Sequence, residues 1–363
     1  MLNKIFSALS HDIGIDLGTA NTLVWVKGKG IVIREPSVVA KHKKTKKVIA
    51  IGEEAKKMIG KTPSTIETVR PVVGGVISDF DATAAMISYY IQKVHEVGNI
   101  IPKAWSHPRV VIGIPSSVTE VERRAVWEAA LSAGAREAFL IEEPMAAAVG
   151  ENISIFLPTG SMIVDIGGGT TEIAIISLGG IVVSKSMKLA GDDMDRAIAH
   201  YIRLRHGLLL GEQTSEDLKI KIGSAYEQIP SKSKDQSPVQ NANSDRMAVI
   251  RGRDIETGLP KTLRVTEVEV REALSPILTR ITDAITDLLE ESPPELTSDI
   301  LEHGIFLTGG GSLLPGLDKL IVERTRIPVV RSEDPLTSVV RGTGKVLEDE
   351  VLLQRIKVIG GLK

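Results

Sequence analysis

One pattern occurs twice in the chain and limits what the chain can fold into. Residues 13–33 read IGIDLGTANTLVWVKGKGIVI, and residues 162–183 read MIVDIGGGTTEIAIISLGGIVV. Both are a strand, an aspartate, a glycine-rich turn, a second strand, a glycine turn and a third strand, with Asp16 matching Asp165. Chance similarity of two hairpins is the alternative. Because the aspartate and both turns recur in register, a domain's length apart, we interpret the pattern as a duplicated domain rather than a solenoid.

The segments outside the two copies alternate between strand and helix patterns. PRVVIGIPSS predicts a buried strand that ends in a loop. The following segment, TEVERRAVWEAALSAGA, predicts a helix with Thr119 as its N-cap and Glu122 at the spacing of a capping box. Such a mixture indicates the α/β class, and 363 residues suffice for two or three domains.

Bulk composition excludes several classes of protein. A net charge of −2 gives no reason to expect nucleic acid as a partner, and the absence of cysteine excludes disulfides and thiolate metal sites. No apolar run approaches the roughly 18 residues of a membrane span, and the first residues lack the pattern of a signal peptide. We therefore expect a cytoplasmic protein.

The two glycine turns predict a phosphate site. Glycine lets a ligand approach the backbone closely, and successive N–H groups in a turn form a nest for an anion. Two such turns facing each other would hold a polyphosphate from both sides, with hydrogen bonds added by the hydroxyls of Thr19, Thr22, Thr170 and Thr171. The carboxylates of Asp16 and Asp165 would repel phosphate unless a hard cation such as Mg²⁺ lay between them. For either hairpin alone, a tight turn without a ligand is an equal alternative.

A third glycine cluster, GIFLTGGGSLLPGL at residues 304–317, reads as a strand, three glycines and a helix start. Its backbone could lie against a purine or a ribose. Glycine at a strand-to-helix turn also occurs for packing reasons alone, so this cluster by itself is weak evidence.

Together these stretches resemble a known family. IDLGTANT, IPSSVTEVERRAV, IEEPMAAA, VDIGGGTTE, LTGGGSLLPGL and RGTGKVLE follow the order of the actin-superfamily motifs. KGKGIVIREPSVVA and RGRDIETGLPKT resemble, more narrowly, the MreB/Mbl family of bacterial actin homologues. The resemblance runs from about Asp12 to Glu348. It implies an α/β, actin-like fold: two RNase-H-like domains around a nucleotide cleft that holds ATP or ADP and Mg²⁺.

The resemblance also implies domain bounds and roles for particular residues. It places domain I at 12–150, returning at about 335–363, domain II at 151–334, and an amphipathic segment at 1–11. Glu143 would position the hydrolytic water with help from Thr170, although an acid at a helix start is also favoured by the helix dipole. Asp16 and Asp165 would associate with the metal. The nucleotide-binding residues would be Gly18, Thr19, Ala20, Asn21, Gly167, Gly168, Gly169, Thr170, Thr171, Gly191, Asp192, Glu216, Lys219, Gly309, Gly310 and Gly311.

Two apolar segments are candidates for membrane contact. Leu2, Ile5, Phe6 and Leu9 share one face of a helix, and a loop carries Ile100, Ile101 and Trp105. Core packing or a frayed tail is the alternative for each. By resemblance, the partners would be further copies in paired protofilaments, the inner face of the cytoplasmic membrane and membrane proteins of the cell-wall elongation complex.

The implied function is a cytoskeletal ATPase whose membrane-associated filaments control cell shape and orient cell-wall synthesis. The alternatives are a small-molecule kinase or a chaperone-type ATPase of the same fold. The chain shows no motif for a dedicated sugar pocket, and we expect no appended substrate domain of the chaperone kind. It departs from the family pattern at Val73–Gly74, Pro315, Arg341 and Lys221, and its polar stretch 229–247 is longer than expected and reads as a flexible loop.

Overall fold

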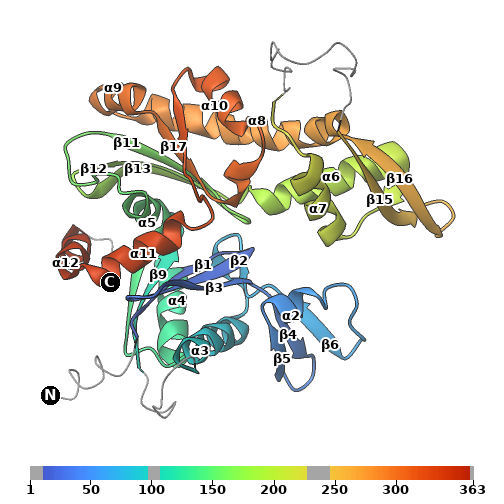
Figure 1. Ribbon diagram of the computed structural model, residues 1–363, viewed down its shortest axis with the longest axis horizontal. Coiled ribbons are helices and arrows are strands. Elements are labelled where there is room, and N and C mark those ends of the chain that lie inside the picture. Colours follow the sequence, from blue (N-terminus) through green and yellow to red (C-terminus); the bar gives the residue numbers. More distant parts are fainter. Residues whose placement is uncertain (1–10, 97–106, 227–245, 360–363) are drawn as a thin grey trace, which may run out of the picture.

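Two five-stranded sheets with the same strand order form the framework of the molecule (Figure 1). The computed structural model describes residues 11–96, 107–226 and 246–359. The first sheet has the order β10-β9-β1-β2-β3 and the second β18-β17-β11-β12-β13. Their strands are β1 (Ile13–Leu17), β2 (Asn21–Val26), β3 (Gly30–Pro36), β9 (Arg109–Ile114), β10 (Glu137–Glu142), β11 (Ser161–Ile166), β12 (Thr171–Ser177), β13 (Gly180–Met187), β17 (Ile305–Thr308) and β18 (Val329–Arg331).

The pairing of these strands confirms the duplication predicted from the sequence. In each sheet the first three strands form an antiparallel meander, and the remaining two add in parallel beside the first strand. Asp16 lies opposite Leu23 in one meander, and Asp165 lies opposite Glu172 in the other. The two aspartates are therefore the last residues but one of equivalent strands, each just before its glycine turn.

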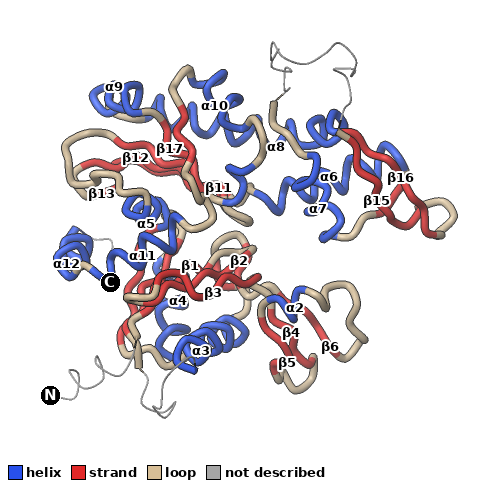
Figure 2. Tube along the Cα trace, in the orientation of Figure 1, coloured by secondary structure: helices blue, strands red, loops and turns tan. Residues whose placement is uncertain are grey.

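Helices cover the outer faces of both sheets and fill the space between them (Figure 2). α3 (Phe80–Glu96) and α4 (Glu120–Ser132) pack on the first sheet, while α8 (Glu267–Glu291), α9 (Pro294–His303) and α10 (Leu317–Thr325) pack on the second. The predicted capping box of α4 is present, because Thr119 accepts from the Glu122 amide and Glu122 accepts from the Thr119 amide. α12 (Glu350–Ile359) follows the last interior helix.

α5 (Glu143–Gly150) and α11 (Ser338–Glu348) lie between the two sheets and contact each other closely. Both consist mainly of buried residues. At their crossing, a Cβ added to Gly342 would collide with the carbonyl oxygen of Ala146, and one added to Gly150 would collide with that of Ser338. Glycine is therefore required at Gly342 by the approach of two helix backbones, and the helices join the two halves.

Two smaller lobes extend from the sheets on the same side of the molecule (Figure 1). The β4–β6 lobe consists of β4 (Val39–His42), β5 (Val48–Ile51), α2 (Glu53–Lys56) and β6 (Ile66–Val69). The α6–α7 lobe consists of α6 (Gly191–His206), β14 (Leu208–Leu209), α7 (Glu212–Ile222), β15 (Met247–Asp254) and β16 (Pro260–Thr266). The short hairpin of β7 (Val72–Val73) and β8 (Val76–Ile77) follows β6.

None of the helices in the described ranges is long and apolar enough to cross a membrane. The membrane candidates Leu2, Ile5, Phe6, Leu9, Ile100, Ile101 and Trp105 lie outside the described residues, as does most of the polar stretch 229–247. Their assignments remain predictions.

Candidate functional site

A pocket of about 400 Å³ opens between the two sheets and is bounded on one side by α6 and α7. This volume is within the range of small-molecule sites, about 300–1,000 Å³. Nearly all the predicted nucleotide and metal residues line it: Asp16, Gly18, Thr19, Ala20, Asn21, Glu143, Asp165, Gly167, Gly168, Gly169, Thr170, Gly191, Asp192, Glu216, Lys219, Gly309, Gly310 and Gly311. Residues chosen from six separate stretches of sequence are thus brought to one cavity.

The two predicted phosphate turns face each other across the floor of this pocket. A Cβ at Gly168 would lie 2.5 Å from the Cβ of Ala20, and one at Gly169 would lie 2.5 Å from the Thr19 Oγ1. Side chains at these positions would force the turns apart, so glycine is needed for the close approach. Ser37 supports the first turn by donating to the Gly18 carbonyl at 2.5 Å.

Burial raises the pKa of three of the carboxyl groups that line the pocket. Burial raises the pKa of Asp16 to about 7, although part of the side chain still faces the pocket. Burial, with smaller contributions from Asp16 and Glu172, raises the pKa of Asp165 to about 8. Glu143, the first residue of α5, is 9% exposed, and burial followed by the charge of Glu172 raises its pKa well above the usual range. Without a ligand, these acids are favoured in their neutral, protonated form. They can ionise together only if a bound cation offsets their negative charge.

Glu172 is a site residue that sequence reasoning missed. It is 1% exposed and lies beside Asp165 in the β11–β12 register. Its carboxylate accepts from the Ser116 amide at 3.0 Å, from the Ser116 hydroxyl at 2.6 Å and from the Ser186 hydroxyl. Ser116 follows β9 of the first sheet, so Glu172 connects the halves behind Glu143. The available signal was its place in VDIGGGTTE, a glutamate on an otherwise apolar strand.

Thr171 is placed differently from the other predicted residues. It is fully buried, does not line the pocket, and donates its hydroxyl to the Leu189 carbonyl at 2.7 Å. Thr170 does line the pocket and is 8% exposed. The hydroxyl of Thr170 is therefore available to a ligand, whereas that of Thr171 serves the packing of β12.

The Gly309–Gly311 cluster has the packing role considered for it, and it also lines the pocket, while its contact with a purine or ribose stays a prediction. Gly309 has a φ of 81°, and a Cβ there would collide with the Asp165 side chain and the Ile166 carbonyl. A Cβ at Gly311 would collide with the Ile166 side chain. Packing against the end of β11 thus requires these glycines, and all three still line the pocket where the chain turns into η2 (Gly310–Leu313).

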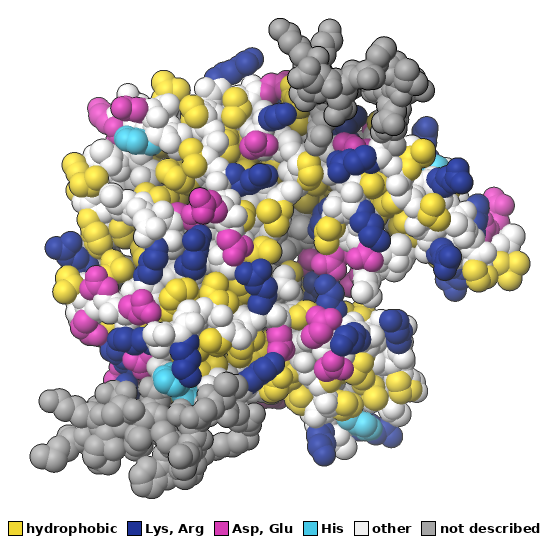
Figure 3. All heavy atoms as spheres, viewed as in Figure 1, with side chains coloured by type: hydrophobic (Ala, Val, Ile, Leu, Met, Phe, Trp, Pro, Cys, Tyr) yellow, Lys and Arg dark blue, Asp and Glu magenta, His cyan; other side chains and the backbone are white. Residues whose placement is uncertain are grey.

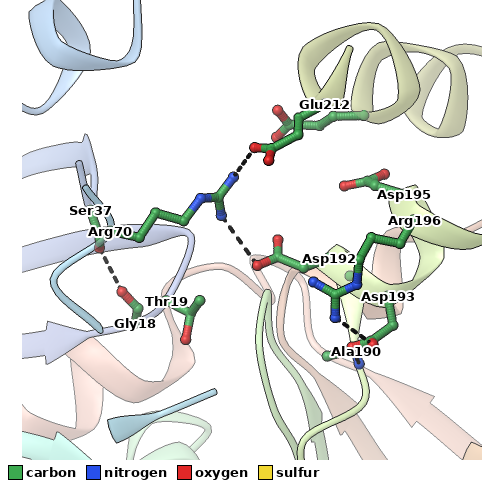
Figure 4. Close-up of polar contacts among 12 residues, drawn as sticks. Gly18, Thr19, Ser37, Arg70, Ala190, Asp192, Asp193, Asp195, Arg196 and Glu212 are labelled. Atoms are coloured by element: carbon green, nitrogen blue, oxygen red, sulfur yellow. Dashed lines mark hydrogen bonds and ion pairs between the residues drawn. The ribbon is translucent and has the colours of Figure 1, made fainter. Parts of the chain in front are cut away.

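The ribose-side residues predicted on α6 and α7 are held by ion pairs, of which Figure 4 shows the one between Asp192 and Arg70. Lys219 donates to the Gly191 carbonyl at 2.9 Å and pairs with Asp195 at 2.9 Å. Asp192 pairs with Arg70 at 3.2 Å, and Glu216 pairs with Lys56 at 3.0 Å. Asp195, Arg70 and Lys56 were not predicted. Asp195 was detectable one helical turn after Asp192, but the two cations come from a different lobe and have no local signal.

The described residues contain no group of three or more His, Cys, Asp or Glu side chains arranged to hold a metal ion. Asp16 and Asp165 supply two carboxylates to one pocket. A cation held by these two carboxylates would complete its coordination with further oxygens, as Mg²⁺ does with phosphates and waters.

Comparison with known proteins assigns this arrangement to a family. The family model described as MreB/Mbl protein matches residues 10–355. The chain belongs to the MreB/Mbl family. It is 49% identical to the cell shape-determining protein MreB of Escherichia coli K12 over 352 residues, 96% of each chain. It is 46% identical to the cell shape-determining protein Mbl of Bacillus subtilis, over 96% of this chain and 99% of that one.

Solved structures confirm the actin-like fold of this MreB/Mbl chain. The crystal structure of MreB5 of Spiroplasma citri bound to ADP superposes with a TM-score of 0.85 at 38% identity, covering 95% of this chain and 98% of that chain. The same protein bound to AMPPNP superposes with a TM-score of 0.84. The resemblance read from the sequence motifs is thereby confirmed.

The nucleotide-free MreB/Mbl chain should lose stability as pH rises, because of its buried acids. The pKa of Asp165 is about 8 in the folded chain against an ordinary value of 3.8, so the folded state binds the proton more tightly. Its contribution is full below pH 4 and is lost as pH rises through about 8. We expect Asp165→Asn to melt increasingly higher than wild type between pH 5.5 and 8.5, measured in EDTA without nucleotide. A difference in melting temperature that is constant with pH would contradict this.

Proposed function

We propose that this chain is a cytoskeletal ATPase that binds ATP and Mg²⁺ between its two domains and assembles into filaments that act in cell-shape control. The observation that carries the proposal is the pair of facing glycine turns, each preceded by an aspartate that lines the pocket. The ADP- and AMPPNP-bound structures of MreB5 support an adenine nucleotide as the ligand.

The chain's own groups suit phosphoryl transfer to water. Backbone N–H groups of the two turns would bind phosphate oxygens, with hydroxyl hydrogen bonds from Thr19 and Thr170. When bound, Mg²⁺ would neutralise phosphate charge, and Asp16 and Asp165 would hold it or its waters. Glu143 would orient the attacking water, since it projects into the same pocket from the first turn of α5.

The proposal extends to how the chain assembles into filaments and where those filaments lie in the cell. Relatives named as cell shape-determining proteins support a role in shape, and we propose self-association into paired protofilaments on the inner face of the cytoplasmic membrane. The segment with Leu2, Ile5, Phe6 and Leu9, together with Ile100, Ile101 and Trp105, would contact lipid. Weak contacts repeated along a filament gain avidity of about 10² or more. Membrane proteins of the elongation complex would be the partners.

Sedimentation tests the proposal directly. We expect the purified protein to pellet with ATP and Mg²⁺, to pellet less with ADP or without nucleotide, and to pellet most with anionic liposomes. Gly168→Val should abolish the nucleotide response, since its side chain would separate the phosphate turns. Gly211→Ser is the matched control, because a Cβ at Gly211 meets nothing within 4 Å. A protein that hydrolyses ATP but stays soluble under all conditions would instead support a small-molecule kinase or a chaperone-type ATPase.

A further inference from the structure

The β4–β6 lobe and the α6–α7 lobe contact each other beside the pocket, and we call this region of contact the mouth. In Figure 3, basic and acidic side chains gather where these two lobes approach each other. The first lobe contributes Lys56, the last residue of α2, and Arg70 follows directly after β6. The second lobe contributes Asp192 from the first turn of α6, and Glu212 and Glu216 from α7. Cations on one side thus meet acids on the other.

Arg70 spans the mouth with a forked contact (Figure 4). One guanidinium nitrogen lies 3.2 Å from the Asp192 carboxylate, and the other lies 3.5 Å from that of Glu212. The Arg70 backbone is held by Ser78, whose hydroxyl donates to the Arg70 carbonyl at 2.8 Å. The planar fork of arginine suits two acids at once, which a lysine reaches less well.

Lys56 makes a second connection on the same side. Its Nζ lies 3.0 Å and 3.3 Å from the two carboxylate oxygens of Glu216. Glu212, Glu216 and Lys219 are spaced at i, i+4 and i+7 on α7, so they share one face of that helix. The first two face the cations of the other lobe, and the third is held by Asp195 and the Gly191 carbonyl.

The cations stand outside the pocket, while two of their partners line it. Asp192 and Glu216 are lining residues, whereas Arg70, Lys56 and Glu212 are not. A ligand can therefore occupy the pocket with both contacts intact, whereas a ligand that leaves between the two lobes has to pass these ion pairs. Asp192 and Glu216 are also the residues assigned to the ribose side of the nucleotide. The ion pairs that join the lobes would therefore also position these two acids beside the nucleotide.

We propose that Arg70 and Lys56 form an ionic latch across the mouth of the cleft, and that this latch controls how fast a bound nucleotide is released. The two cations are positioning residues, because they act on the nucleotide through Asp192 and Glu216. The inference rests on the proposed nucleotide site and adds the determinant of its exchange rate. Since the chain would need fresh ATP after each turnover, the latch also limits how soon a subunit is ready to assemble again.

The expected change in the release rate is set by the partial exposure of the ion-paired side chains. The side chains of Arg70 and Asp192 are 32% and 23% exposed, and those of Lys56 and Glu216 are 30% and 34% exposed. Ion pairs of this kind contribute modestly and are weakened by salt, whose screening length is about 8 Å at 0.15 M. We expect each of Arg70→Ala and Lys56→Ala to speed nucleotide release by about three- to tenfold, and the double variant to speed it further.

The experiment is a stopped-flow chase of a fluorescent ADP from the full-length protein, below the concentration at which it pellets. Wild-type release should accelerate between 50 and 500 mM KCl, and release from the double variant should be fast and nearly independent of salt. Lys57→Ala is the matched lysine control, because its ion pair is with Glu54 on its own helix. Arg124→Ala is the matched arginine control, since it pairs with Glu128 on α4. Arg70→Lys should restore part of the slow release.

The outcomes separate the two proposals. Release rates of Arg70→Ala and Lys56→Ala equal to wild type, with nucleotide still bound, would overturn the latch and leave the nucleotide site standing. Equal acceleration in the Lys57→Ala and Arg124→Ala controls would also overturn it, because general loss of charge would then explain the effect. Failure of the wild-type protein to bind the nucleotide would remove the proposed function and the latch together. Melting temperatures near wild type are expected for all variants, as the substituted side chains are partly exposed.

Discussion

Glu143→Gln is expected to slow phosphate release from ATP by about 10²- to 10³-fold while nucleotide binding and assembly persist, since a positioned acid or base typically contributes about 10²–10⁴. Glu143 is buried at the start of α5 and lines the pocket beside Asp16 and Asp165. Glutamine keeps the shape and one acceptor oxygen but removes the charge that would polarise a water. The rate is measured by single-turnover phosphate release, with pelleting of the same samples.

Glu142→Gln is the control for this experiment. Glu142 is the neighbouring carboxylate, at the end of β10, and lies 3.7 Å from Arg123 rather than in the pocket. It should hydrolyse ATP at close to the wild-type rate. Equal rates in Glu143→Gln and wild type would return Glu143 to its other interpretation, an acid placed at a helix start for the sake of the helix dipole.

Gly342→Ala is expected to destabilise the protein by about 3 kcal/mol or more, because overpacking at a rigid backbone contact is among the costly substitutions. The added Cβ would meet the Ala146 carbonyl oxygen, a backbone atom that cannot rotate away. Helix propensity alone predicts the opposite, since alanine in a helix interior is favoured over glycine by about 1 kcal/mol. The sign of the change in urea midpoint therefore decides between packing and propensity.

The control for this substitution is Gly211→Ser. Gly211 is the N-cap of α7 with extended backbone angles, and a Cβ there meets nothing within 4 Å. Serine is a good N-cap, so this variant should unfold at the wild-type midpoint or slightly above it. A midpoint for Gly342→Ala at or above that of wild type would show that α5 and α11 can move apart at little cost.

Local patterns predicted the elements of the fold and the floor of the site. The hairpins around Asp16 and Asp165, the strand from Arg109 to Ile114 and the capped helix after Thr119 were all readable from spacing, because each depends on neighbours in sequence. The close approach of the two phosphate turns was predicted from the repeated sequence pattern and its glycines, without knowledge of the tertiary structure.

Features that depend on tertiary contact were not predictable in this way. Lys41 is the first residue of the basic run KHKKTKK, a composition typical of a solvated turn, yet its side chain is buried and pairs with Asp79. Thr171 has the same local context as Thr170, but the pleat of β12 directs its hydroxyl to Leu189 rather than to the pocket. Arg70 and Lys56 meet acids more than a hundred residues away in sequence, at separations of 122 and 160. Sequence spacing carries no information about such pairs.

The position of α11 has a consequence for folding during translation. Its residues pack against β1, β2 and β9, and the Lys27 amine donates to the Leu347 carbonyl across a sequence separation of 320. While the chain is being synthesised, the first sheet emerges early but lacks this helix until nearly all of the described chain has left the ribosome. The second sheet has its own strands and outer helices complete by then. The half that is made first is therefore finished last, and its uncovered apolar face is a natural target for chaperones during translation.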